Sequence, residues 1–239
     1  FKNEFVFDNT IVKGLNLYNG GRYKFFAEYY RHLEEKNTDV FVIGLDARHY
    51  KKLSHSIIWA NRFAASTSVG SQKLLYYMGG VDAWLFPQFN RDAEVSENEQ
   101  YAYQTLATNM RGFNQNVRNG NSFFLVNTEL RVPLFKYLLR RPITSDFINN
   151  FQIVTFADFG TAWNGRTPFS KENQINYEVI ENGPVTITID SQKNPFVGGF
   201  GAGARSRLFG YFVRADWAWG LEDGYLLPNI LYISLGLDF

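Results

Sequence analysis

The chain ends in Ile230-Leu-Tyr-Ile-Ser-Leu-Gly-Leu-Asp-Phe239, and this stretch decides the fold class. Apolar and polar residues alternate along it, as they do along a β-strand with two different faces. The apolar face carries Leu231, Ile233, Leu235, Leu237 and Phe239. The other face carries Tyr232, Ser234, Gly236 and Asp238. This contrast fits a sheet with lipid outside and a polar interior, and an edge strand of a soluble sandwich is the alternative.

The composition favours the membrane interpretation. The 239 residues include 23 Phe, 14 Tyr and 5 Trp, yet the mean hydropathy is slightly negative. No uncharged apolar run reaches the ~18 residues that a transmembrane helix needs. A membrane-spanning strand needs only ~10 alternating residues. The absence of cysteine excludes a disulfide framework and cysteine-ligated metal, and the net charge of +1 argues against nucleic acid as a partner.

The same alternation recurs along much of the chain. Between 122 and 132, apolar residues alternate with Asn127, Glu129 and Arg131, so charges of both signs lie opposite the apolar stripe. We predict about nine antiparallel strands from this pattern. They lie at 3–12, 20–33, 38–53, 55–69, 121–136, 151–163, 198–209, 210–220 and 229–239.

The connections between these strands are unequal. Turns at 34–37 and 53–55 are short, whereas 70–120 and 164–197 form long polar loops. Short turns on one rim and long loops on the other are usual for transmembrane barrels. About nine strands is an odd number, and no signal peptide is present, so we expect residues 1–239 to form the C-terminal part of a single barrel domain.

Three motifs follow one another in the second half of the chain: Asn109-Met-Arg-Gly-Phe113, Asn127-Thr-Glu-Leu-Arg-Val-Pro133 and Phe156-Ala-Asp-Phe-Gly160. With the terminal Phe239, their order resembles the BamA-type superfamily of outer-membrane assembly and translocation barrels, also called the bacterial surface antigen family. The spacing agrees, because five predicted strands follow the Arg-Gly-Phe loop, as in that family. The resemblance covers residues 70–239 well and residues 1–69 only by strand pattern.

The resemblance implies a fold, a location and a function. It implies a transmembrane antiparallel β-barrel of about 16 strands in the outer membrane of a Gram-negative bacterium, or of an organelle of similar origin. Its partners would be the lipid bilayer with lipopolysaccharide, other outer-membrane or periplasmic assembly proteins, and unfolded client barrels. It implies insertion of client proteins or polypeptide translocation through a gated seam between first and last strands, with no bond broken and no cofactor. The alternatives are a passive pore, and a sealed scaffold that acts through surface loops 81–108 and 164–195.

The motif residues also have a physical logic of their own. Arg111 at the tip of a loop is costly to bury in a lumen unless a carboxylate meets it. Alternation puts Asp158 on the inward face of its strand, so a directional guanidinium–carboxylate contact can hold the loop inside the barrel. Glu129 is the second expected acceptor. The alternative is that Asp158 pairs with a neighbouring lumen arginine such as Arg131, Arg205 or Arg207.

The complete predicted site has two parts. The loop contact comprises Arg111, Gly112, Phe113, Glu129, Phe156, Asp158 and Gly160. Gly112 permits a tight backbone there, and Gly160 leaves room beside the aspartate. The seam and assembly signal comprise Pro228, Gly236 and Phe239. Pro228 and Gly236 are expected to limit pairing of the final strand, and a terminal Phe belongs to the assembly signal in the family.

Some features depart from the family or carry no chemistry. Gly79-Gly80 is separated from Arg111 by an insertion, of which 91–100 is expected at the surface. The glycine run 198–203 has no nucleotide-loop context and predicts a strand start where backbones approach closely. The only histidines are His32, His49 and His55, which are scattered, so we predict neither a metal site nor an enzyme.

Overall fold

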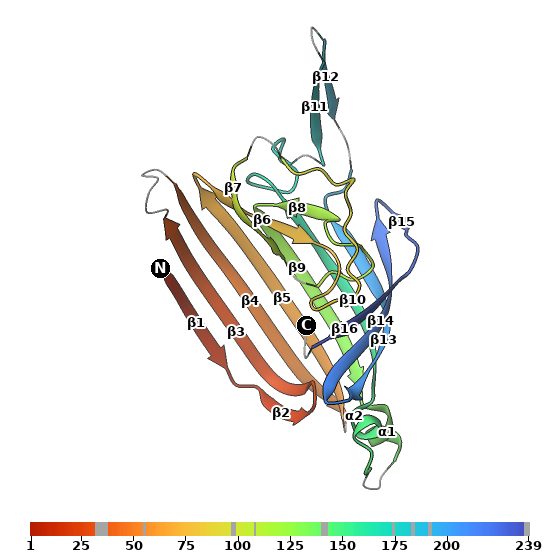
Figure 1. The fold of residues 1–239 in the computed structure, drawn as a ribbon. Helices are drawn as coiled ribbons and strands as arrows, with labels where there is room; N and C mark the ends of the chain where they lie inside the picture. The colour runs from red at the N-terminus through yellow and green to blue at the C-terminus, as the bar shows by residue number, and fades with distance from the viewer. Residues whose placement is uncertain are drawn as a thin grey trace.

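The computed structural model describes residues 1–31, 38–54, 56–96, 99–107, 109–139, 143–173, 175–182, 185–190 and 193–236. Within this part of the chain, one large antiparallel sheet contains 11 strands (Figure 1). Its long strands are β1 (Lys2–Asp8), β3 (Leu17–Arg31), β4 (Asp39–Ser54), β5 (Ile57–Gly70), β9 (Ser122–Val132), β10 (Gln152–Trp163), β13 (Val197–Leu208), β14 (Tyr211–Glu222) and β16 (Ile230–Leu235). The all-β, antiparallel class predicted from the alternation is therefore confirmed.

The long strands follow one another across the sheet in chain order, from β1 through β14 to β16. Two short strands complete it: β2 (Ile11–Gly14) pairs with β3, and β15 (Tyr225–Leu226) pairs with β14. The predicted single strand 3–12 is wrong, because the chain turns between β1 and β2. There the Asn9 side chain accepts a hydrogen bond of 2.7 Å from the Gly21 amide.

The connections hold more structure than the alternation indicated. The loop predicted at 70–120 contains β6 (Lys73–Met78), β7 (Tyr101–Leu106) and β8 (Arg118–Gly120), which form a small sheet of 3 strands. The second loop contains the hairpin of β11 (Tyr177–Asn182) and β12 (Val185–Asp190). The predicted strand 121–136 ends at Val132, because Pro133 has no amide to donate, and α1 (Leu134–Leu138) and α2 (Asp146–Asn150) follow.

Both long loops leave the sheet at the same end (Figure 1). Gly70, where the first loop begins, pairs with Val40, so Arg31 and Asp39 also lie at this end. The helices α1 and α2 lie at the opposite end. The expected division into a rim of short turns and a rim of long loops is thus only partly correct. Both long loops do share one end, but β3 and β4 are also joined at that end, and the connection from β9 to β10 at the opposite end contains two helices. The predicted turn 34–37, His32, His55 and the terminal Phe239 lie outside the described residues.

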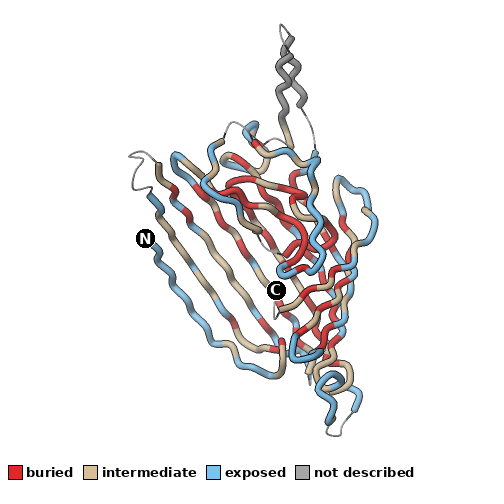
Figure 2. Tube along the Cα trace, viewed as in Figure 1, coloured by how far each residue is buried: buried red, intermediate tan, exposed pale blue. Residues whose placement is uncertain are grey.

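The exposed face of the sheet is apolar, and charged side chains are buried on the other face. On β14, Trp217 is 51% exposed, whereas its neighbour Asp216 is 1% exposed. The exposed face of the sheet carries large apolar side chains: Phe5, Phe25, Ile43, Trp59, Phe63, Ile153, Phe159, Phe200, Trp217 and Leu231. Buried residues gather where the first long loop packs against the other face (Figure 2). The loop therefore completes a core on the face that also holds the buried charged residues, together with apolar residues of the sheet such as Val42 and Leu125.

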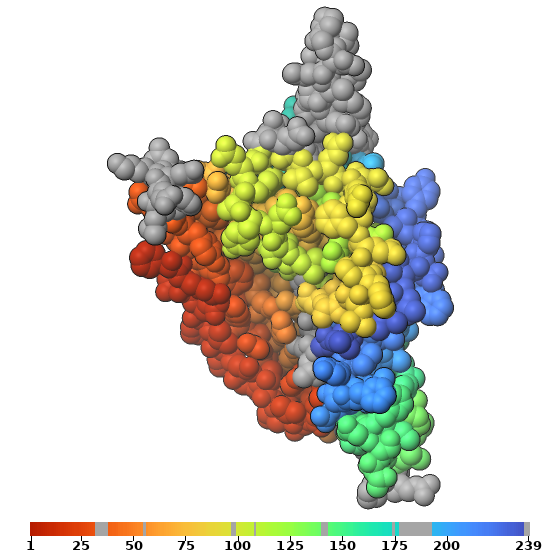
Figure 3. Space-filling model, in the orientation of Figure 1, coloured from red at the N-terminus to blue at the C-terminus, as the bar shows by residue number. Residues whose placement is uncertain are grey.

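This core lies between the loop and the sheet. Tyr76 on β6 packs edge-on against Phe123 on β9, with ring centroids 4.8 Å apart. Met78, Met110 and Phe113 belong to the same buried cluster. In the space-filling view the loop, in yellow and yellow-green, covers part of the sheet (Figure 3). Apolar burial and the charged contacts described below thus hold the loop in the same place.

Candidate functional site

The predicted contact between the long loop and β10 is present. Arg111 is 3% exposed, and its Nε and Nη2 donate to the two carboxylate oxygens of Asp158, each over 2.7 Å. The Arg111 backbone amide donates to the same carboxylate over 3.1 Å. A two-pronged contact of this kind is directional as well as charge-assisted. It fixes the position and the orientation of the loop tip.

Glu129 on β9 accepts from several arginines at once. Arg111 Nη1 donates to it over 2.6 Å, Arg131 Nε over 2.8 Å, and Arg205 through two nitrogens over 2.7 and 2.9 Å. Asp216 on β14 lies 3.5 Å from Arg205. Arg111, Arg131 and Arg205 thus share the buried carboxylates of Glu129, Asp158 and Asp216 among them. Asp158 therefore does not pair with one of the neighbouring arginines instead of Arg111. Arg131 and Arg205 bind Glu129, and Arg207 lies exposed beside Asp146.

The aromatic residues of the motifs lie close to Arg111. The guanidinium carbon of Arg111 lies 3.7 Å from the centre of the Phe156 ring, which is a cation–π distance. Burial alone would lower the pKa of Arg111, but the charges of Asp158 and Glu129 raise it above its ordinary value. Phe113 is buried in the core beside the loop. The surrounding carboxylates thus favour the charged form of Arg111.

The loop backbone lies flush against β13 and β14. A Cβ at Gly199 would overlap the carbonyl oxygen of Arg111. Gly112 has a φ of 96°, and a Cβ there would lie 2.6 Å from the Trp219 carbonyl oxygen. The close approach predicted for the run 198–203 is thus confirmed. Gly160 differs from prediction: its missing side chain makes room for Phe124 and Leu125 on β9, not for Asp158.

Substituting Gly199 tests this close approach. We expect Gly199→Ala to lower the free energy of unfolding by about 1–3 kcal/mol, because the loop tip must move away from the wall. Gly198→Ala is the matched control, since a Cβ there meets only the Asp158 carbonyl oxygen at 3.8 Å. Urea unfolding of the purified protein measures the free energy of unfolding of both variants. Equal stability of the two variants would contradict the packing described here.

Two residues that the predicted site did not include complete it: Asn127, the first residue of the second motif, and Tyr232. Asn127 Nδ2 donates to Asp158 over 2.8 Å and to the Asn109 carbonyl over 2.9 Å. The Tyr232 hydroxyl on β16 accepts from the Gly112 amide over 3.0 Å and donates to the Phe113 carbonyl over 2.7 Å. β16 therefore binds the loop tip directly through two hydrogen bonds. Tyr232 is an aromatic residue on an otherwise small polar face, and this was the available signal in the sequence.

Removing the Tyr232 hydroxyl tests these two hydrogen bonds. We expect Tyr232→Phe to cost about 1–3 kcal/mol, because the ring keeps its place while a buried amide and a buried carbonyl lose their partner. The control is Tyr225→Phe, whose side chain is 75% exposed and which should leave stability unchanged. Hydrogen exchange at the Gly112 amide should rise only in the first variant. No change at that amide would contradict the bond.

The seam residues are only partly described. Pro228 precedes β16, and the Leu227 amide before it bonds to the Gly220 carbonyl over 2.8 Å. The Gly236 amide donates to the Phe212 carbonyl over 3.0 Å. The ladder between β14 and β16 runs only from Ile230 to Leu235, between Pro228 and Gly236, with one further backbone hydrogen bond to β14 beyond each end. That these two residues limit pairing at the seam stays a prediction.

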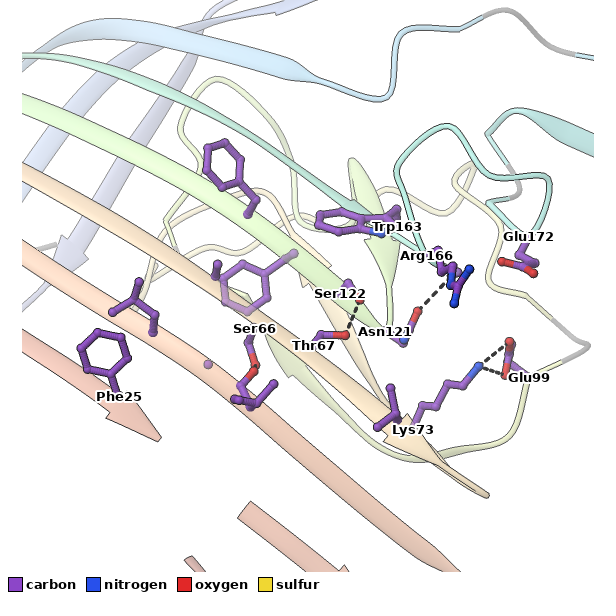
Figure 4. Close-up of a pocket in the computed structure, with 18 residues that line it drawn as sticks. Phe25, Ser66, Thr67, Lys73, Glu99, Asn121, Ser122, Trp163, Arg166 and Glu172 are labelled. Carbon is purple, nitrogen blue, oxygen red and sulfur yellow. Dashed lines mark hydrogen bonds and ion pairs between the residues drawn. The ribbon is translucent and has the colours of Figure 1, made fainter. Parts of the chain in front are cut away.

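A groove of about 890 Å³ lies near the long-loop end of the sheet. Its apolar lining includes Phe25, Ile43, Leu45, Ala65, Val69 and Phe124. At its rim, Lys73 forms an ion pair of 2.6 Å with Glu99, and Thr67 is hydrogen-bonded to Ser122 over 2.7 Å (Figure 4). The groove thus joins apolar wall residues to a charged rim.

A scan against protein-family models found no match, and a search of curated proteins found none either. Among the described residues, no helix has the length and apolar character needed to cross a membrane. The same residues contain no group of three or more His, Asp or Glu side chains placed to hold a metal ion.

Proposed function

We propose that this chain forms the C-terminal part of a BamA-type outer-membrane β-barrel that inserts client barrels or translocates polypeptides. One observation carries the proposal: the sheet is apolar and exposed on one face, while the other face holds a buried charged cluster that binds the Arg111 loop. In a soluble antiparallel sheet the exposed face is polar. Exposed apolar area of this extent is typical of membrane contact.

The energetics favour lipid as the solvent of the apolar face. Removing one large apolar side chain from water stabilises a protein by about 1.5–3 kcal/mol. Many such side chains on the outer face are left exposed by the fold itself. A bilayer covers them, and the groove beside Phe25 and Phe124 suits a lipid chain, with the Lys73–Glu99 pair at headgroup level. Lipid, including lipopolysaccharide, is therefore the partner of this surface.

Function would depend on the last strand and not on bond-making chemistry. In this mechanism the seam between the barrel's first strand and β16 opens, and the exposed edge pairs with an incoming strand. The Arg111 loop would brace the wall beside that seam, because it binds β10 through Asp158 and β16 through Tyr232. The brace holds the remaining wall in shape while the edge is free.

A sealed scaffold is the second candidate. It is favoured by the same dense packing, because Arg111, Glu129 and Arg205 fill the space beside β9, β10 and β13. The packing argues against a wide passive pore beside these three strands. The surface loops would then carry the function.

Locking the seam distinguishes these candidates. One cysteine replaces Leu231 on β16, and a second is placed on the first strand of the intact barrel; the pair is oxidised in cells. We expect assembly of other outer-membrane proteins to stop and to recover on reduction. A disulfide between Ser206→Cys and Val213→Cys, which are register partners on β13 and β14, is the control. Unchanged assembly with a locked seam would exclude the gated insertase and leave the scaffold.

A further inference from the structure

The second edge of β16 is occupied by the chain itself. On this edge the Leu85 amide donates to the Ile233 carbonyl over 2.9 Å, and the Leu235 amide donates to the Ala83 carbonyl over 3.3 Å. These two bonds flank an antiparallel bridge between Trp84 and Ser234. This is the pattern of one rung of an antiparallel ladder. We call Ala83–Leu85 the cap segment.

A single aromatic side chain anchors the cap segment. Trp84 is 9% exposed, and its ring centroid lies 4.8 Å from that of Tyr232, at an interplanar angle of 58°. The following residues Leu85 and Phe86 are 46% and 71% exposed. The cap thus resembles a bound peptide with one buried anchor and an exposed downstream flank.

The chain enters the cap through a tight turn. Ala83 has a φ of 52°, in the left-handed region that a non-glycine residue seldom adopts. Just before it, the Asp82 amide donates to Asn109 Oδ1 over 2.5 Å, and the Asp82 carbonyl accepts from Arg214 over 3.3 Å. The turn is therefore held in place by side chains from the loop and from β14.

The cap is also attached to the Arg111 loop. The Met110 amide donates to the Gly80 carbonyl over 2.9 Å, and the Gly80 amide donates to the Phe113 carbonyl over 3.0 Å. The segment that covers the edge and the segment that carries Arg111 are consequently hydrogen-bonded neighbours. Movement of one displaces the other.

The cap is short compared with the strand that it covers. β16 pairs with β14 at 6 register positions, from Val213↔Leu235 to Ala218↔Ile230, whereas the cap forms one rung. A full strand would make more ladder bonds on this edge and could replace the cap. A short cap nevertheless blocks unselective pairing, which an open edge invites.

We propose that Ala83–Leu85 is a built-in cap on the seam edge of β16, and that an extended strand pairs there only after the cap leaves. The incoming strand would carry an aromatic side chain at the register of Trp84, to take its place against Tyr232. The regulatory meaning of the cap rests on the proposed function, because a gated seam is what it would control. The placement of the cap on β16 does not depend on the proposed function.

The placement is tested with paired cysteines in the full-length protein in its membrane. Trp84 and Ser234 form the non-hydrogen-bonded pair, whose Cα separation of about 4.5 Å suits a disulfide. We expect the Trp84→Cys/Ser234→Cys protein to oxidise readily. The Leu85→Cys/Ser234→Cys protein is the control and should oxidise at least tenfold more slowly, since residue 85 points to the other side of the rung. Equal rates would overturn the proposal.

Displacement is tested with a labelled peptide that copies residues 80–88. Leu85→Pro removes the amide that binds Ile233, whereas Leu85→Ala keeps it. We expect the peptide to bind the proline variant at least tenfold more tightly than the alanine variant, and the oxidised Trp84→Cys/Ser234→Cys protein to bind less peptide than its reduced form. Equal binding within both pairs would overturn the proposal.

The two proposals fail in different ways. Peptide binding and disulfide formation do not require client assembly. If both behave as expected while seam locking leaves clients unaffected, the cap stands and the insertase function fails. If seam locking blocks assembly but the cysteine pair oxidises no faster than its control, the function stands and the cap fails.

Discussion

Replacing Arg111 by alanine is expected to lower the free energy of unfolding by about 3–5 kcal/mol, the range observed when one partner of a buried ion pair is removed. The change leaves Asp158 without its two-pronged donor, and Glu129 loses one of its three arginines. It also releases the loop tip from β10. Urea unfolding of the purified protein measures the loss.

A double-mutant cycle shows whether the effect belongs to the pair. We expect Arg111→Ala and Asp158→Ala to be costly singly and the double variant to cost clearly less than their sum, because no buried charge of this pair then lacks its partner. Arg166→Ala, at an exposed residue, is the control for loss of an arginine. Strict additivity in the cycle would show that the two side chains are not coupled.

Replacing Glu129 by glutamine should destabilise the protein by a similar amount, about 3–5 kcal/mol. The substitution keeps the shape of the side chain and removes the charge. Three guanidinium groups then share two carboxylates, and the new amide nitrogen faces donors. We expect a loss at least as large as that of Asp158→Asn, whose carboxylate binds only Arg111 among these arginines.

The matched control for this change is Glu4→Gln. Glu4 lies on β1 at a partly exposed position and forms ion pairs with Lys2 and Lys24 over 3.0 and 2.7 Å. Pairs of that kind contribute little, so the control should leave the free energy of unfolding nearly unchanged. If Glu129→Gln behaves like Glu4→Gln, the charged cluster does not hold the loop.

Together these contacts make the loop a structural link across the wall. Arg111 reaches β10 and β9, Tyr232 reaches from β16, and the glycines at 199 and 112 allow the backbones to touch. A loop bound on several sides resists displacement in a way that no single ion pair does. The cap segment extends the same link to the far edge of β16.

The sequence predicted the parts of this protein that depend on local pattern. Alternation over a few residues defines a strand and its two faces, because successive side chains point to opposite sides. It therefore located the long strands and placed Asp158 and Glu129 on the inner face. It also indicated the pairing of Arg111, since a buried guanidinium requires a carboxylate.

Only the tertiary structure decided which residues contact one another. Nothing local in the sequence states that Tyr232 binds the backbone of Gly112, that Arg205 shares Glu129 with Arg131, or that β6, β7 and β8 form a sheet inside the first long loop. These contacts join residues far apart in the chain, and their geometry depends on how the whole sheet curves around the loop. The alternation determined which face each side chain takes, and the path of the chain determined its partner.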